Sequence, residues 1–168
     1  ILTLNYRQVR PNREYMFIFI SDTHIDAPLE SHPLKNALEE IESQHDISAL
    51  FLLGDIFEFW WGDDHCDPNY KQWEDFFKQR SYPIYLIVGN RDFLLSSTFF
   101  KKTCITCLPS GSVLNVAGQH IALFHGDEEA LVEPNYHLFK RFIRSRFLRT
   151  CFSCLPENLR CSLSRRGR

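Results

Sequence analysis

Four short polar motifs in the sequence carry residue types that bind metal ions. They are Ser21-Asp22-Thr23-His24, Gly54-Asp55, Gly89-Asn90-Arg91-Asp92 and His125-Gly126-Asp127. Carboxylate, amide and imidazole groups in this mixture suit Mn²⁺, iron or Zn²⁺ better than Ca²⁺ or a thiolate-bound ion. Buried carboxylates such as Asp22 and Asp55 are unfavourable without a partner, and a bound cation supplies one. The motifs therefore predict a metal site.

The spacing of the motifs indicates that they share this site. Asp55 follows Asp22 by 33 residues, Asn90 follows Asp55 by 35, and His125 follows Asn90 by 35. Each step is close to one βαβ unit of about 30 residues. Because ligands bind outside the carboxyl ends of parallel strands, we expect the motifs to meet there. The side chains expected to converge are Asp22, His24, Asp55, Asn90 and His125.

Phosphoryl transfer to water is the chemistry that such a site supports. A carboxylate such as Asp55 is able to bridge two ions about 3.5–4 Å apart, and such a pair activates water while it clamps a phosphoryl group. Arg91 stands beside a ligand, and its guanidinium binds phosphate through two hydrogen bonds. Each motif alone has a simpler explanation, because a strand-end Asp often serves only in a turn and a lone His is often a core residue. Their joint occurrence favours the metal site.

Buried strands that alternate with helices must position these motifs. The apolar runs Tyr15–Ile20, Ala49–Leu53 and Ile84–Val88 are too continuous for one-sided burial and predict buried strands. Helices are predicted over Pro33–His45 and Pro68–Arg80, because each segment opens with a Pro suited to a first helical turn. This alternation predicts a parallel sheet in an α/β layered fold.

The alternation of predicted strands and helices changes after the third predicted strand. Asp92 is placed to cap a short third helix that continues to Lys101. Residues 113–124 are apolar on both sides of Gly118, which predicts a hairpin leading into a last buried strand, Ile121–Phe124.

Composition favours one domain with an uneven charge distribution. The chain has 168 residues, 44% of them apolar, which is enough for one core. Residues 1–139 carry 10 basic and 20 acidic side chains, whereas residues 140–168 carry 9 and 1. The apolar run nearest the start, Tyr15–Ile20, is far shorter than the ~20 residues of a membrane span, so we expect a cytoplasmic protein. The expected organisation is a leading arm (1–14), a core (15–136), a basic amphipathic helical segment (137–159) and a basic tail (160–168).

The six cysteines permit a different interpretation. Cys104 and Cys107, and Cys151 and Cys154, have the pair spacing of a structural zinc site. The two pairs are far apart, however, and the first lies in an apolar stretch where Cys is typical as a small hydrophobic residue. A zinc or nucleic-acid module thus remains an alternative with weak support.

The polar motifs resemble those of a known superfamily. Asp22-x-His24, Gly54-Asp55, Gly89-Asn90 and His125-Gly126-Asp127 look like the four successive motifs of calcineurin-like metallophosphoesterases. The longer stretches Gly54-Asp55-Ile-Phe-Glu58-Phe-Trp-Trp-Gly62-Asp63-Asp64 and Gly89-Asn90-Arg91-Asp92-Phe93-Leu94-Leu95 are most similar to bacterial UDP-2,3-diacylglucosamine diphosphatases of lipid A biosynthesis. In that family Arg stands where most relatives have His after the Asn. Tyr136 also matches, and Glu133 stands where the family has Asp. The resemblance covers about residues 15–150.

The resemblance implies an activity and a role for each matching residue. The activity is hydrolysis of UDP-2,3-diacylglucosamine to UMP and 2,3-diacylglucosamine 1-phosphate with two divalent ions, for which Mn²⁺ is expected. Asp22 and His24 would bind one ion and Asn90 and His125 the other, with Asp55 bridging both. The implied catalytic residues are Asp55, Asn90 and Arg91, and the implied substrate-binding residues are Arg91, Glu133 and Tyr136. The implied fold is a layered α/β sheet sandwich flanked by helices.

The chain departs from the family at its last motif. The family closes both metal sites with Gly-x-His-x-His, and no His follows His137 here. Each ion would lose a ligand, so the sandwich looks truncated and the 168-residue chain by itself is expected to be inactive or poorly active. Two alternatives stay open: another calcineurin-like phosphoesterase, and a non-catalytic metal-binding or interaction module.

The charged segment after residue 136 bears on the location of the substrate. Apolar residues recur at helical spacing, with basic residues between them. The apolar set is Leu138, Phe139, Phe142, Ile143 and Phe147, and the basic set is Lys140, Arg141, Arg144, Arg146 and Arg149. Such a helix either packs its apolar side on the core or binds an anionic membrane surface. The aromatic segment Phe57–Trp61 also favours a lipid-linked substrate, so we expect peripheral binding to the inner membrane and no nucleic-acid partner.

Overall fold

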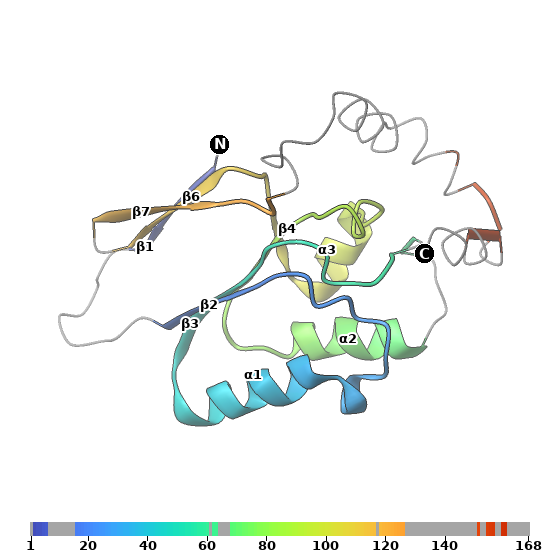
Figure 1. The fold of residues 1–168 in the computed structure, drawn as a ribbon, viewed down its shortest axis with the longest axis horizontal. Helices are drawn as coiled ribbons and strands as arrows, with labels where there is room; N and C mark the ends of the chain where they lie inside the picture. Colours follow the sequence, from blue (N-terminus) through green and yellow to red (C-terminus); the bar gives the residue numbers. More distant parts are fainter. Residues whose placement is uncertain are drawn as a thin grey trace.

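Two β-sheets form the frame of the molecule. The computed structural model describes residues 2–6, 16–60, 62–63, 68–116, 118–126, 151, 154–156 and 159–160. The first sheet is parallel and has the order β2-β3-β4-β5, and the second has the order β1-β6-β7 (Figure 1). The strands are β1 (Thr3–Tyr6), β2 (Met16–Ile20), β3 (Ile47–Leu52), β4 (Ile84–Ile87), β5 (Thr106–Leu108), β6 (Ser112–Val116) and β7 (Gln119–Leu123).

Helices connect the successive parallel strands. A 3₁₀ turn (Leu29–Ser31) and α1 (Pro33–Gln44) join β2 to β3, α2 (Pro68–Lys78) joins β3 to β4, and α3 (Ser97–Thr103) joins β4 to β5. Pro33 occupies the first helical turn of α1, and the His32 ring accepts a hydrogen bond from the Leu34 amide at 3.2 Å. These crossovers return the chain to the same edge of the sheet after each helix.

The first sheet is covered on both faces, which produces three layers. Along β3, Leu50 and Leu52 belong to the core shared with the helices, whereas Ala49 and Phe51 belong to the core shared with β6 and β7. All four are fully buried, because alternate residues of a strand face opposite sides. Helices α1 and α2 lie on the side of the parallel sheet that faces away from β1, β6 and β7 (Figure 1). The expected layered α/β sandwich is confirmed.

An aromatic cluster fixes the loop that follows β3. The Phe57 and Trp60 side chains are fully buried, with ring centroids 4.7 Å apart. The Trp60 ring also lies 4.9 Å from Phe99 of α3, and its indole nitrogen donates to Asp63 at 2.8 Å. Within the aromatic segment Phe57–Trp61, Phe57 and Trp60 therefore belong to the core, whereas Phe59 is only partly buried.

Most of the expected elements are present near their expected bounds. The strands predicted from Ala49 and Ile84 are β3 and β4, and the two helices opened by Pro33 and Pro68 are α1 and α2. The hairpin is also confirmed, because β6 and β7 pair antiparallel on either side of Gly118. Residues 3–6 of the segment expected to be a leading arm form β1, which pairs in parallel with β6.

Four details differ from the expectations. Asp92 does not cap the third helix: α3 begins at Ser97, and the Ser96 hydroxyl caps it by accepting from the Thr98 amide at 3.1 Å. β2 is an edge strand, so full burial is wrong for it, and Phe19 remains 41% exposed. β7 is also an edge strand, and in it only Leu123 is buried. The short strand β5 was not predicted, because three residues show no clear periodicity.

Some expectations fall outside the described residues. These are most of the basic amphipathic segment 137–159, most of the basic tail, and the placement of Glu133 and Tyr136. Within the described part of the chain, no helix has the length and hydropathy needed to cross a membrane.

Candidate metal centre

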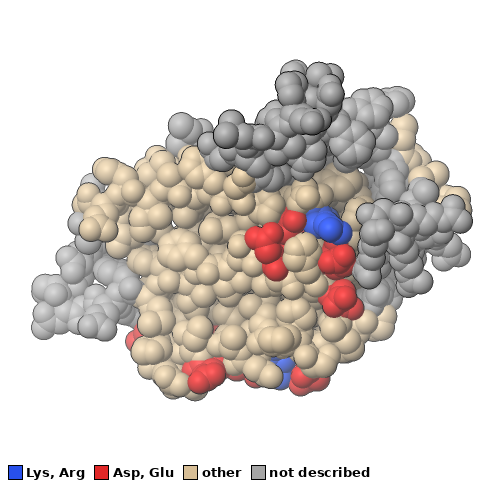
Figure 2. All heavy atoms as spheres, in the orientation of Figure 1, with Lys and Arg blue, Asp and Glu red and all other residues tan. Residues whose placement is uncertain are grey.

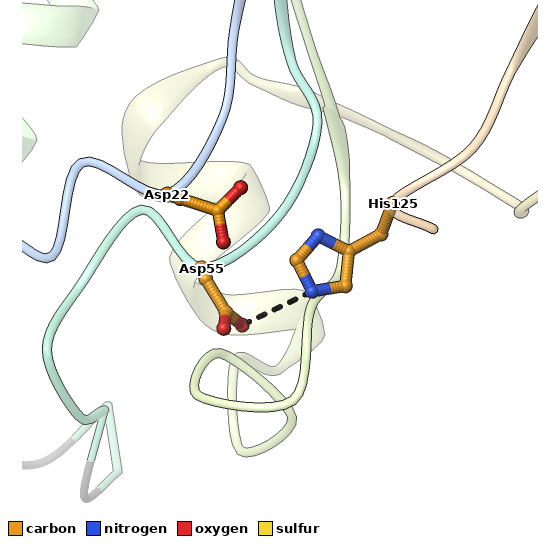
Figure 3. Close-up of side chains that lie close together, drawn as sticks. All are labelled: Asp22, Asp55 and His125. Atoms are coloured by element: carbon orange, nitrogen blue, oxygen red, sulfur yellow. Dashed lines mark ion pairs between the residues drawn. The ribbon is translucent and has the colours of Figure 1, made fainter. Parts of the chain in front are cut away.

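Three potential ligands meet at the carboxyl ends of three strands. Asp22 follows β2, Asp55 follows β3, and His125 follows β7. A ligand atom from each lies within 4.8 Å of the other two. Figure 3 shows the three side chains pointing toward one another from separate segments of the chain. The sheet architecture thus brings together groups that are 33 to 103 residues apart in the sequence.

The backbone is bent at the residues that carry these groups. Asp22, His24 and Asp55 all have positive φ, at 53°, 47° and 52°. Non-glycine residues rarely adopt this left-handed region, and each instance costs about 1–3 kcal/mol. Hydrogen bonds between the two loops hold it: the Asp22 amide donates to the Gly54 carbonyl at 3.0 Å and the His24 amide to the Asp55 carbonyl at 3.2 Å. Such backbone strain is typical of functional sites.

Two glycines allow the loops to approach. Gly54 has φ +91°, and a Cβ on it would lie 2.6 Å from Cγ of His125. A Cβ on Gly89 would overlap the Asp55 carboxylate and its backbone nitrogen. The Gly-Asp and Gly-Asn pairs of the sequence therefore have a packing reason, since a side chain at Gly54 would displace His125 and one at Gly89 would displace Asp55.

His125 is oriented with one ring nitrogen toward the site. Its Nδ1–H donates to the Leu53 carbonyl at 2.7 Å, because a carbonyl oxygen only accepts. Nε2 then carries the lone pair and lies 3.5 Å from Oδ1 of Asp55. Both side chains are almost fully buried, with 6% and 7% of their surface exposed. A hydrogen bond at Nδ1 that leaves Nε2 available is the usual arrangement of a metal-binding histidine.

The loop after β4 wraps around the Asp55 carboxylate. The Arg91 amide donates to Oδ1 of Asp55 at 2.9 Å. One terminal atom of the Asn90 amide lies 2.6 Å from Oδ1 of Asp55 and also contacts Oδ2. If that atom is the nitrogen, it donates two hydrogen bonds; if it is the oxygen, a cation between the two groups relieves the contact between acceptors. Asn90 is thus placed against Asp55 as the spacing predicted.

His24 faces a different partner. Its Nδ1 lies 3.0 Å from Oε2 of Glu58, and the other oxygen of that carboxylate, Oε1, lies 3.2 Å from Nη1 of Arg91. His24 is not part of the group formed by Asp22, Asp55 and His125. Sequence reasoning gave Glu58 no role, and the signal for it is a single acidic residue inside the aromatic run Phe57–Trp61, three residues after Asp55.

Asp92 links the loop that carries Asp55 to the loop that carries Asn90 through hydrogen bonds. It is fully buried and accepts from the backbone amides of Ile56 at 3.2 Å, Phe57 at 3.1 Å and Gly89 at 3.4 Å. Burial raises the pKa of Asp92 to about 6, and the nearby Asp55 contributes to the rise, although the three amides oppose it. Sequence reasoning placed Asp92 at a helix cap and so missed this role.

The described residues fit a divalent cation. Carboxylate oxygens from Asp22 and Asp55 together with an imidazole nitrogen form the donor set of Mn²⁺, iron or Zn²⁺ sites. Donor atoms that share one ion lie within about 4–5 Å of one another, and the closeness of two carboxylates is unfavourable unless a cation balances them. On the face drawn in Figure 2, acidic side chains gather beside a basic one within a mostly uncharged surface.

The cysteine alternative gains no support. Cys104, Cys107, Cys151 and Cys154 are exposed and form no disulfide bonds. Among the described residues, the only group of three or more potential ligands is that of Asp22, Asp55 and His125. A zinc site built from the two cysteine pairs is therefore absent from the described part of the chain.

Comparison with known proteins gives a consistent result. Residues 15–157 match the calcineurin-like phosphoesterase family. The UDP-2,3-diacylglucosamine hydrolase of Photobacterium profundum is 35% identical over 148 residues, which is 85% of this chain and 60% of the relative. The hydrolase of the same name from Aeromonas salmonicida is 37% identical over 152 residues, 88% of this chain and 59% of the relative. The chain thus spans about 60% of the length of these relatives.

Proposed function

The chain belongs to the calcineurin-like phosphoesterase family, and we propose that it acts in the hydrolysis of the diphosphate of UDP-2,3-diacylglucosamine, with UMP and 2,3-diacylglucosamine 1-phosphate as products. Relatives up to 37% identical carry this substrate in their names. The observation that carries the proposal is the convergence of Asp22, Asp55 and His125 within 4.8 Å, beside the Arg91 loop.

Divalent metal ions are implied by the family, and Mn²⁺ is the ion that we propose. Asp22 and His24 would hold one ion and Asn90 and His125 the other, with Asp55 placed between them. When bound, the ions supply a Lewis-acid centre that activates water and stabilises charge on the phosphoryl oxygens. The mixed oxygen and nitrogen donor set supports Mn²⁺ over Ca²⁺.

The protein's own residues orient the reactants. Asp55 occupies the centre of the site and accepts a hydrogen bond there from the Arg91 amide. His125 is kept with Nε2 toward the site by the Leu53 carbonyl. The Arg91 guanidinium is partly exposed, at 36%, which leaves it accessible to a phosphate of the substrate. We propose that it neutralises diphosphate oxygens, and that Glu133 and Tyr136 lie near the substrate.

A lipid-linked substrate implies work at a membrane surface. We propose that the basic segment 137–159 binds the anionic inner membrane from the cytoplasmic side, since each basic residue near such a surface contributes about 1 kcal/mol. Sedimentation with liposomes tests this. Binding is expected to require anionic lipid, to weaken as salt rises, and to fall when Arg141, Arg144 and Arg146 become Gln. Equal binding to neutral and anionic vesicles would contradict the proposal.

The activity is tested by following release of UMP from UDP-2,3-diacylglucosamine with added Mn²⁺. The assay uses the full product of the gene and, in parallel, the 168-residue chain. Asp55→Ala is expected to lower activity at least about 100-fold, because it removes the residue shared by both ions. Arg91→Ala is expected to weaken turnover while Mn²⁺ binding is retained.

The matched control is Asp75→Ala. Asp75 is also an Asp, but it is half-exposed on α2 and pairs with Lys71 at 2.8 Å. Its replacement is expected to leave activity unchanged. Near-normal turnover by the Asp55 variant, or no hydrolysis of this substrate by the full product when other phosphodiesters are cleaved, would refute the proposed function. The second result would identify another calcineurin-like phosphoesterase activity.

A further inference from the structure

One carboxylate connects the two halves of the site, and it belongs to Glu58. Glu58 lies 34 residues from His24 and 33 from Arg91 in the sequence, yet it contacts both. Oε2 lies 3.0 Å from Nδ1 of His24, and Oε1 lies 3.2 Å from Nη1 of Arg91. Each carboxylate oxygen therefore has a different partner. The Glu58 carbonyl oxygen accepts from the same Arg91 Nη1 at 3.4 Å.

The backbone of Glu58 is held rigidly. Its amide donates to the Ile25 carbonyl at 3.0 Å, and Ile25 forms a parallel bridge with the adjacent Phe57. Ile25 and Phe57 are fully buried. Because the main chain on both sides of Glu58 is fixed by the core, its carboxylate reaches the site from a defined position. This distinguishes the contact from an ordinary surface ion pair, in which two long side chains must both be ordered.

The contact with His24 determines which ring nitrogen carries the proton. An ionised carboxylate only accepts hydrogen bonds, so the neutral His24 ring must be protonated at Nδ1. Nε2 then presents its lone pair, as Nε2 of His125 does through the Leu53 carbonyl. Hydrogen bonds from carboxylates to metal-binding histidines fix the tautomer and the ring orientation, and their loss lowers metal affinity about 10–100-fold.

The contact with Arg91 determines the direction of the guanidinium. Every hydrogen bond of the Arg91 side chain to described residues uses Nη1 and goes to Glu58. Nη2 and Nε are then available for a phosphate, which matches the planar fork in which a guanidinium binds two oxygens at once. The Arg91 side chain is 36% exposed and that of Glu58 only 19%, so the anchor is more protected than the group it holds.

We propose that Glu58 is a positioning residue that sets the His24 tautomer and the Arg91 orientation together, so that one carboxylate aligns a metal-binding ring with a phosphate-binding guanidinium. The roles of His24 and Arg91 in this statement rest on the proposed function. Glu58 itself need not touch the substrate.

The test uses spectroscopic readouts from the metal-free 168-residue chain. Long-range ¹H–¹⁵N correlation spectra at pH 8, with the His24 signals identified from His24→Gln, report which ring nitrogen is protonated. The wild type is expected to show the Nδ1–H tautomer at His24 and separate Nη resonances for Arg91, which indicate hindered rotation. Glu58→Ala is expected to lose both signatures and to bind Mn²⁺ about 10-fold more weakly.

Two further variants separate positioning from charge. Arg91→Ala is expected to keep the Nδ1–H tautomer of His24, because the Glu58 carboxylate remains. Glu58→Gln removes the charge but leaves one acceptor oxygen, so it is expected to keep one of the two signatures, and it carries the test if Glu58→Ala fails to fold. The matched control Glu39→Ala removes an exposed Glu that pairs with Lys35 at 3.4 Å, and it is expected to change neither signature.

The outcome decides the inference independently of the enzymatic activity. An unchanged His24 tautomer and unchanged Arg91 resonances in Glu58→Ala would overturn it, as would loss of both signatures in Glu58→Gln, which would show that only charge matters. If both signatures behave as expected but UDP-2,3-diacylglucosamine is not hydrolysed, the proposed function fails while the positioning by Glu58 stands.

Discussion

Replacement of Asp92 by Ala is expected to destabilise the protein strongly, although Asp92 contributes no apolar surface. The Asp92 carboxylate is fully buried and accepts hydrogen bonds from the amides of Ile56, Phe57 and Gly89. In Asp92→Ala these three amides lose their acceptor inside the core. The loops that carry Asp55 and Asn90 then lose the group that links them.

The magnitude follows from two opposing terms. A buried amide without a partner costs about 1–3 kcal/mol, so three amides cost about 3–9 kcal/mol. Burying the charged carboxylate is itself unfavourable, since the pKa of Asp92 is raised from 3.8 to about 6. A rise of about 2 units corresponds to about 3 kcal/mol, which the substitution recovers at pH 7. From the middle of the first range, we expect a net loss of about 3 kcal/mol in the free energy of unfolding.

Urea unfolding at pH 7 in the presence of a chelator measures this loss. Trp60 and Trp73 are fully buried, so tryptophan fluorescence reports the unfolding of the core. The control Asp75→Ala removes a half-exposed Asp paired with Lys71, and its effect is expected to stay below about 1 kcal/mol. An Asp92→Ala protein within about 1 kcal/mol of the wild type, with the same dependence on urea, would refute the reasoning.

Three other predictions concern glycine, pH and metal. Gly118→Ala is expected to cost about 1–2 kcal/mol of stability, because Gly118 has φ +82° but open space around it. Gly54→Ala, at φ +91°, also overlaps His125 and is expected to cost more in parallel urea titrations. Equal costs for the two variants would contradict the close packing at Gly54. Burial raises the pKa of Glu74 above 4.5, so the stabilising contribution of its proton is largest below pH 4.5 and falls as pH rises through the folded-state pKa. Glu74→Gln should therefore be more stable than the wild type at pH 7 and lose that gain near pH 4. A constant difference in stability between the two proteins across this range would argue against the reasoning. Mn²⁺ is expected to raise the melting temperature of the wild type, and His125→Ala should reduce that shift in differential scanning fluorimetry. Equal shifts in the two proteins would show that His125 does not bind the metal.

The elements of the fold were largely predictable because their signals are local. The run from Ala49 to Leu53 is apolar at every position, which is typical of a strand buried on both faces, and β3 is such a strand. Pro33 and Pro68 open α1 and α2 because their fixed φ suits a first turn. Edge strands were harder to recognise, since Phe19 of β2 has the same residue type as a core position but lies where one neighbour is missing.

The sequence by itself determined where the chemical groups stand along the chain. The near-equal spacing of Asp22, Asp55 and Asn90 follows from repeated strand–helix units, which return these groups to one edge of the parallel sheet. His125 comes instead from the end of β7 in the second sheet, which the spacing did not indicate. The tertiary structure decided which groups touch. Asp92 turns toward Ile56 and Phe57 instead of a helix end, and Glu58 reaches both His24 and Arg91. These contacts join residues 33 to 36 positions apart, and their geometry depends on left-handed bends and close packing that no local periodicity encodes.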